Sequence, residues 1–164
     1  MAKIAIMGLG VVGGGTADLL TENREKIRVS CGEYLDLKYI LDIRDLPESP
    51  YRDLIVHDIA PILDDPEVSV VAETIGGVKH AYEYTVRLLR AGKSVVTSNK
   101  QLVSEHGAEL LALAKEHGCR YLFEASTGGG IPVIGPLSRD LSANEGRIRS
   151  GAWYPRKPPP RTGK

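Results

Sequence analysis

The sequence contains little cysteine: Cys31 and Cys119 are the only two in 164 residues. They do not form a CxxC pair, and neither has a neighbour at the spacing of a metal site. A metal or redox centre built on cysteine is therefore not expected. We interpret both residues as free thiols of a protein that resides in a reducing compartment, the cytoplasm.

An excess of charge and a long apolar run are also absent. Lys and Arg together number 21 and are balanced by 21 Asp and Glu, which gives no electrostatic reason to expect nucleic acid or an anionic membrane as a partner. No apolar run approaches the roughly 18 residues of a membrane span. The N-terminal stretch MAKIAIMGLG lacks the apolar core and cleavage site of a signal peptide. These features favour a cytoplasmic protein.

Aromatic side chains make up only 5% of the chain, whereas glycine occurs 18 times. This composition suits an α/β domain with many tight turns between strands and helices. Apolar runs of strand length alternate with stretches of helical periodicity, which predicts a doubly wound, mostly parallel, Rossmann-like sheet in a single domain over residues 1–145. We predict strands at 3–7, 37–43, 68–72, 94–97 and 121–125, and helices at 11–27, 59–63, 80–91, 105–117 and 132–141.

The last residues, 146–164, have a different composition. They include six basic residues, four prolines and the only tryptophan, and no acidic residue. Such a basic, proline-rich segment is typical of a disordered or extended tail. Binding to an acidic surface or to an aromatic-lined groove is the alternative interpretation.

A glycine-rich motif of the form GxGxxG follows the first predicted strand and opens the first predicted helix. It consists of Gly8, Gly10 and Gly13, with Val11 and Val12 between the last two. The first glycine permits a sharp turn, the second lets the backbone approach a pyrophosphate, and the third allows close packing of helix on strand. The free N–H groups of the helix N-terminus would then bind the phosphates. We therefore predict a dinucleotide site here; a plain glycine turn is the alternative.

The end of the second predicted strand bears on the choice of dinucleotide. An acidic residue there binds the ribose hydroxyls of NAD, and an arginine accommodates the 2′-phosphate of NADP. The sequence offers both, as Asp42 and Arg44, with Asp45 as a further ribose partner. If Asp42 points away from the ligand, Arg44 lies at the exit of the strand. On this basis we expect NADP to be preferred and NAD to be accepted.

Three further polar segments follow predicted strands: ETIGG at 73–77, TSNK at 97–100 and EASTGGGIP at 124–132. Ligands gather at the carboxyl ends of strands in doubly wound sheets, so these segments are candidates for one site. Gly76 and Gly77 would let the backbone lie close to a ribose. Lys100 either faces this ligand or is solvated at a turn.

The motifs GLGVVGGG, ETIGG, AGKSVVTSNKQLVSEHGAEL and EASTGGGIPVIGPL, in this order, resemble homoserine dehydrogenase from residue 3 to about residue 145. That family interconverts homoserine and aspartate semialdehyde with NAD(P), in the biosynthesis of threonine and methionine. The resemblance implies that Lys100 is the catalytic residue beside the nicotinamide. It also implies a monovalent cation near Glu124 and Thr127, and a cofactor cleft lined by Thr74, Gly76, Thr97, Ser98 and Asn99.

The resemblance ends in the basic tail, where AWYPRKPPPRTGK replaces the course expected of the family. This pattern resembles a truncation or a change of reading frame. We therefore expect cofactor binding but little turnover of the small-molecule substrate by the chain alone. A non-catalytic NAD(P)-binding regulatory or sensing module is the alternative function, and the sequence does not decide the oligomeric state.

Overall fold

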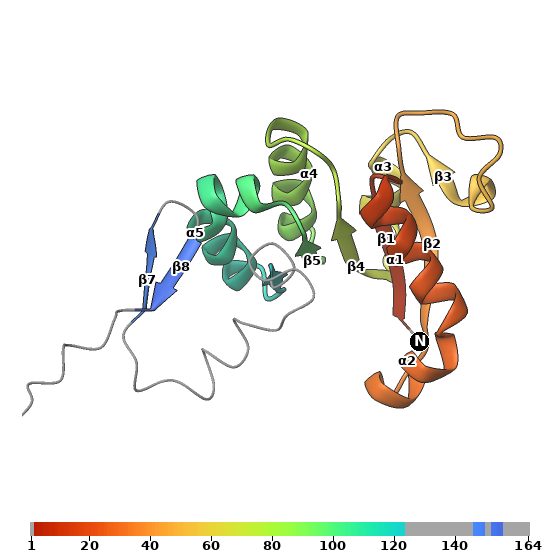
Figure 1. Cartoon of the computed structure of the whole chain (residues 1–164), viewed down its shortest axis with the longest axis horizontal. Coiled ribbons are helices and arrows are strands. Elements are labelled where there is room, and N and C mark those ends of the chain that lie inside the picture. The colour runs from red at the N-terminus through yellow and green to blue at the C-terminus, as the bar shows by residue number, and fades with distance from the viewer. Residues whose placement is uncertain (1, 124–145, 150–151, 156–164) are drawn as a thin grey trace, which may run out of the picture.

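Short runs of aliphatic and β-branched residues form one sheet of six strands, all parallel to their neighbours. The computed structural model describes residues 2–123, 146–149 and 152–155 (Figure 1). The strand order is β3-β2-β1-β4-β5-β6, so the two central strands are β1 and β4. The strands are β1 (Ala2–Met7), β2 (Leu35–Leu41), β3 (Ile55–Val56), β4 (Val68–Glu73), β5 (Ser94–Thr97) and β6 (Tyr121–Leu122).

Helices cover both faces of this sheet. Alternation along β1 shows the two faces, since Ala5 and Met7 belong to one buried cluster and Ile6 to another. The cluster around Ile6 includes Ala17 of α1, whereas the larger one includes residues of α3, α4 and α5. The helices are α1 (Val11–Glu22), α2 (Arg24–Cys31), α3 (Ala60–Asp64), α4 (Lys79–Arg90) and α5 (Lys100–Glu116), with one 3₁₀ turn, η1 (Arg52–Leu54). The predicted doubly wound α/β fold is confirmed.

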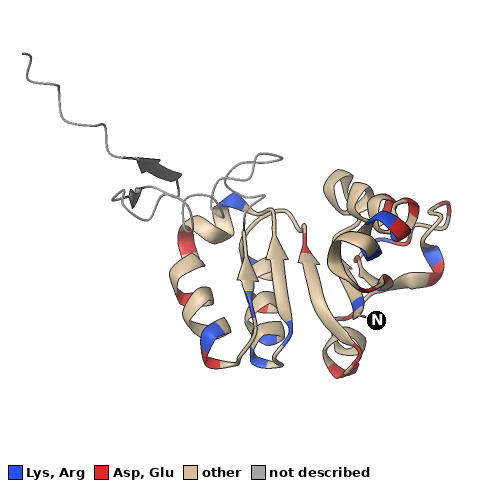
Figure 2. Ribbon diagram, turned by 90° about the horizontal axis from the view of Figure 1, so that it is seen from below, with Lys and Arg blue, Asp and Glu red and all other residues tan. Residues whose placement is uncertain are grey.

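Parallel strands place all their carboxyl ends at one edge of the sheet, as the strand arrows of Figure 2 show. The strand order reverses direction between β1 and β4, because the chain moves outward to β2 and β3 and then returns to β4. In doubly wound sheets this reversal opens a crevice that binds ligands. The segments after β1, β4 and β5 therefore meet at one edge of the molecule.

Some predicted elements differ from those observed. The single helix predicted over residues 11–27 is wrong: Asn23 separates α1 from α2. Its N–H donates to the carbonyl of Leu19 at the end of α1, and its own carbonyl accepts the N–H of Ile27 in α2. Asparagine competes for backbone hydrogen bonds and has low helix propensity, which favours a break at this residue. The helix predicted from 105 begins at Lys100 instead, and β3 was not predicted.

The region after β6 contains two more strands in the described part of the chain. Gly146–Arg149 forms β7 and pairs antiparallel with Ala152–Pro155, which forms β8. The tail predicted over residues 146–164 as disordered or extended includes both of these strands, and its other residues lie outside the described part of the chain. The predicted helix at 132–141 lies outside the described residues.

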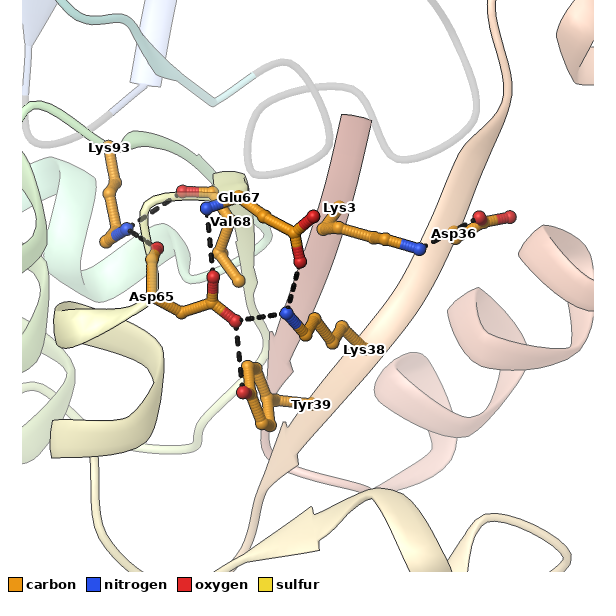
Figure 3. A network of polar contacts seen from close by, with 8 residues as sticks. All are labelled: Lys3, Asp36, Lys38, Tyr39, Asp65, Glu67, Val68 and Lys93. Atoms are coloured by element: carbon orange, nitrogen blue, oxygen red, sulfur yellow. Dashed lines mark hydrogen bonds and ion pairs between the residues drawn. The ribbon is translucent and has the colours of Figure 1, made fainter. Parts of the chain in front are cut away.

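A polar network ties the strands together at the opposite, amino edge of the sheet (Figure 3). Asp65 accepts a hydrogen bond from Tyr39 and pairs with Lys38 at 2.5 Å. The bond from Lys38 lowers the pKa of Asp65 to about 2. The buried Lys93 donates to the carbonyls of Asp65 and Val68, and burial lowers its pKa. This network therefore lies at the edge of the sheet opposite to the carboxyl ends of the strands.

None of the helices in the described part of the chain is long and apolar enough to cross a membrane.

Candidate functional site

Three glycines give the loop after β1 its shape. Gly8 has φ +93°, in the region that favours glycine, and a Cβ there would lie 3.2 Å from the carbonyl oxygen of Thr74. A Cβ on Gly13 would lie 1.9 Å from the carbonyl oxygen of Gly8, so only glycine lets α1 approach β1 this closely. A Cβ on Gly10 would meet no atom within 4 Å. The loop therefore has no room for a side chain at Gly13, whereas the space next to Gly10 is not filled by protein atoms.

The N-terminus of α1 presents free N–H groups at this open side. The N–H of Gly14 is the first to bond within the helix, to the carbonyl of Gly10. The N–H groups of Val11, Val12 and Gly13 precede it and have no acceptor in the preceding turn. Val11 is 96% exposed, and this fully described helix has neither a side-chain cap nor an acidic residue in its first turn. The geometry and the helix dipole both favour a bound anion.

Thr74 forms hydrogen bonds to the backbone at the start of the glycine loop. Its hydroxyl lies 2.9 Å from the carbonyl oxygen of Met7 and 2.7 Å from that of Gly8, and its own N–H donates to Met7. We predicted that Thr74 lines the cofactor cleft. In the structure its hydroxyl is directed at the loop, so its contribution is to keep the loop in position.

The carboxylate of Asp42 also supports the glycine loop. It is buried and accepts the N–H of Leu9 at 2.8 Å. Arg44 donates to it from its backbone N–H, its Nε and its Nη2, and Nη2 also donates to the carbonyl of Leu9. These bonds, that from Arg44 above all, hold the pKa of Asp42 well below its usual range. The condition from which we argued for NADP, that Asp42 points away from the ligand, is not met, because the carboxylate faces the glycine loop.

Arg44 nevertheless lies where the sequence placed it, at the exit of β2, and its side chain is 55% exposed. Next to it is a hollow of about 300 Å³. His57 contributes to this hollow, bonding to the carbonyl of Asp42 through Nδ1 and pairing with Asp45 through Nε2 at 3.2 Å. Sequence reasoning missed His57 because β3, which leads into it, is only two residues long. The lining consists of Asp45, Leu46, Pro47, Arg52, Ile55 and His57.

The TSNK segment forms the start of α5. Asn99 is the N-cap, and its Oδ1 accepts the N–H of Leu102 at 3.0 Å. Lys100 is the first helical residue, and it is exposed. The sequence signal for this cap was present, since asparagine is among the preferred N-cap residues. The structure therefore places Lys100 at the carboxyl edge of the sheet, beside the end of β5.

The segments after β4 and β5 are joined to each other. The Nδ2 group of Asn99 lies 3.2 Å from the carbonyl oxygen of Ile75 and 2.6 Å from that of Gly77. The N–H of Ser98 donates to the carbonyl of Glu73. The structure thus brings together the predicted residues at the carboxyl end of β5 and in the segments after β4 and β5: Thr74, Gly76, Gly77, Thr97, Ser98, Asn99 and Lys100.

The two residues of the predicted cation site, Glu124 and Thr127, lie outside the described residues. In the part of the chain that the structure describes, no three His, Cys, Asp or Glu side chains gather as metal ligands.

The strand order, the glycine loop and the open helix N-terminus together define a Rossmann-like dinucleotide-binding domain. The family model "Homoserine dehydrogenase, NAD binding domain" matches residues 8–124, and the chain belongs to this family.

Known relatives agree with this membership. The chain is 39% identical to homoserine dehydrogenase of Bacillus subtilis and 41% identical to that of Pseudomonas aeruginosa, with 87% of this chain covered in both. It spans about a third of their length, 34% and 33%. Among solved structures, a homoserine dehydrogenase from Thiobacillus denitrificans is similar, with a TM-score of 0.79, 35% identity, and coverage of 88% of this chain and 34% of that one.

Proposed function

We propose that this chain binds NAD(P) as the cofactor-binding part of an oxidoreductase that interconverts homoserine and aspartate semialdehyde. One observation carries the proposal: the open N-terminus of α1 and the Lys100 segment lie at the same carboxyl edge of a sheet of this family. Such an enzyme would serve amino-acid biosynthesis, in the branch toward threonine and methionine.

The fit of the cofactor follows from the shape of the loop. Space is open above Gly10, and the N–H groups at the start of α1 are free to bind a pyrophosphate. The bound nicotinamide would supply the hydride chemistry. Lys100 would polarise the oxygen on the reacting carbon, or take the proton of the hydroxyl as a general base. The cation predicted at Glu124 and Thr127 stays a prediction.

We further propose that NADP is preferred and NAD is accepted. Arg44 supports this preference, because its exposed guanidinium stands beside the glycine loop and neutralises Asp42. A 2′-phosphate would contact the exposed guanidinium of this ion pair, whereas Asp42 without Arg44 would present a bare carboxylate that repels the phosphate.

Thermal unfolding of the purified chain with NADP, with NAD and with neither tests the proposal. A ligand that binds only the folded state raises Tm with its concentration. We expect both dinucleotides to raise Tm, and NADP to do so at a lower concentration. In Arg44→Ala the preference for NADP should be lost, while Arg52→Ala, which removes a cation that lines the hollow, serves as the control. If neither dinucleotide raised Tm, the proposal would be wrong.

A further inference from the structure

A fully buried carboxylate lies at the end of β4, and the chemistry proposed above does not use it. Glu73 is 0% exposed. It accepts the N–H of Ile75 at 2.7 Å and the hydroxyl of Thr97. Burial raises the pKa of Glu73, while its hydrogen bonds act in the opposite sense. A buried carboxylate is unfavourable unless it is well bonded, so an apolar residue would serve packing alone at least as well.

The bonds of Glu73 form part of a closed ring between two strand ends. The Oγ1 atom of Thr97 donates to Glu73 and accepts the N–H of Asn99 at 2.9 Å. The side chain of Asn99 donates to the carbonyl of Ile75. The N–H of Ile75 is bonded to Glu73, which closes the ring. The ring thus links the segment after β4 to the N-cap of α5, and Lys100 is the next residue after that cap.

The ring lies on one definite side of the crevice. The glycine loop after β1 would take the pyrophosphate, and the end of β2, with Asp42 and Arg44, lies on the side that receives the adenosine ribose. The strands β4 and β5 are on the other side of β1. A dinucleotide that spans the crevice therefore places its nicotinamide half over the segments that the ring joins.

We infer that Glu73 is a positioning residue, which holds the segments after β4 and β5 in the arrangement that receives the nicotinamide half of the cofactor. It acts through Thr97 and Asn99 and touches neither the reacting atoms nor the pyrophosphate. This inference rests on the proposed cofactor binding.

The test compares each dinucleotide with its nicotinamide-free counterpart. Calorimetric titration gives the affinity of the chain for NADP and 2′-phospho-ADP-ribose, and for NAD and ADP-ribose. In Glu73→Gln, an amide replaces an oxygen that now accepts a hydrogen bond. We expect the variant to bind the dinucleotides about tenfold more weakly and the nicotinamide-free ligands as the wild type does. Glu67→Gln is the matched control, because Glu67 pairs with Lys38 at the opposite edge of the sheet.

A second pair of variants keeps the test decisive if Glu73→Gln does not fold. Thr97→Val removes the hydroxyl that bonds Glu73 and should reproduce the selective loss, whereas Thr97→Ser keeps the hydroxyl and should restore dinucleotide affinity. Equal loss for both kinds of ligand, or no loss in any variant, would overturn the positioning role. Equal affinity of the wild type for a dinucleotide and its counterpart would overturn it as well. A folded wild type that binds none of the four ligands would instead overturn the proposed function, and the inference with it.

Discussion

At the scale of single residues, neighbouring glycines have different tasks, and alanine substitutions separate them. Gly13→Ala forces a Cβ against the carbonyl of Gly8, so we expect a loss of about 1–3 kcal/mol in the free energy of unfolding. Gly10→Ala meets no protein atom, so it should cost less than about 1 kcal/mol. It should nevertheless weaken the stabilisation by NADP, because the added methyl occupies the space above the loop. Urea unfolding with and without NADP measures both effects.

Gly15 provides the control for these substitutions. It lies one turn into the same helix, is exposed, and has open space around its Cβ position. Gly15→Ala should raise stability by roughly 0.5–1 kcal/mol through helix propensity and leave NADP binding unchanged. If Gly10→Ala behaves like Gly15→Ala in both measurements, the open space above Gly10 is not the pyrophosphate site.

Asp42 makes a residue-scale prediction about pH. Its folded pKa is depressed, so it adds stability that is fully present above its ordinary value of 3.8 and is lost as pH falls below that value. Asp42→Asn should therefore lower the free energy of unfolding by about 2 kcal/mol at pH 7, where a charge-assisted bond is lost. The difference from wild type should shrink below pH 3.8. Urea unfolding across this range, with the exposed Glu48→Gln as control, measures the effect; a constant difference would contradict it.

At the scale of elements, the start of α5 combines a helix cap with a bridge to the segment after β4. Asn99→Ala removes both and should cost at least about 1 kcal/mol of stability. Asn99→Asp keeps an oxygen for the cap, yet places a carboxylate against the carbonyls of Ile75 and Gly77. We therefore expect the aspartate variant also to be destabilised in thermal unfolding. Wild-type stability of Asn99→Asp would show that Asn99 acts only as a cap.

Elements with a strong pattern were predictable from the sequence, and short or interrupted ones were not. Ser94–Thr97 matched its prediction, because an apolar β-branched run between a glycine turn and a polar cluster has few alternatives. The two residues of β3 follow a loop with two prolines and have too little periodicity to be recognised. Asn23 interrupts a pattern that reads as one helix. The early start of α5 was missed because the polar TSNK cluster was interpreted as the ligand-binding end of a strand and not as a helix cap.

At the scale of the whole molecule, a polar network that we expect to serve stability alone is separated by the length of the sheet from the candidate site. The network of Asp65, Lys38 and Lys93 lies at the amino edge, and the candidate site lies at the carboxyl edge. Asp65→Asn should lower Tm at pH 7 and leave the affinity for NADP unchanged. Because the folded pKa of Asp65 is about 2, below its ordinary 3.8, the loss in Tm should diminish as pH falls through this interval. A changed affinity for NADP would contradict the separation.

The site was predictable in outline, since motifs after parallel strands must meet at one edge. The direction of individual side chains was not. Thr74 turns its hydroxyl toward the glycine loop, and Asp42 faces that loop while held by Arg44. The bonds of Thr74 and Asp42 to the glycine loop join residues more than 30 positions apart, and local patterns do not encode such contacts. Local patterns also do not encode the bond of Glu73 to Thr97, which lies 24 positions away on the next strand.

Direct titration of the purified 164-residue chain with NADP and NAD, by calorimetry, tests the central claim that this domain binds a dinucleotide. We predict saturable binding of one dinucleotide per chain, with tighter binding of NADP and a weaker interaction in Gly10→Ala. Absence of saturable binding for both dinucleotides, in a sample whose circular dichroism shows a folded α/β domain, would contradict the account.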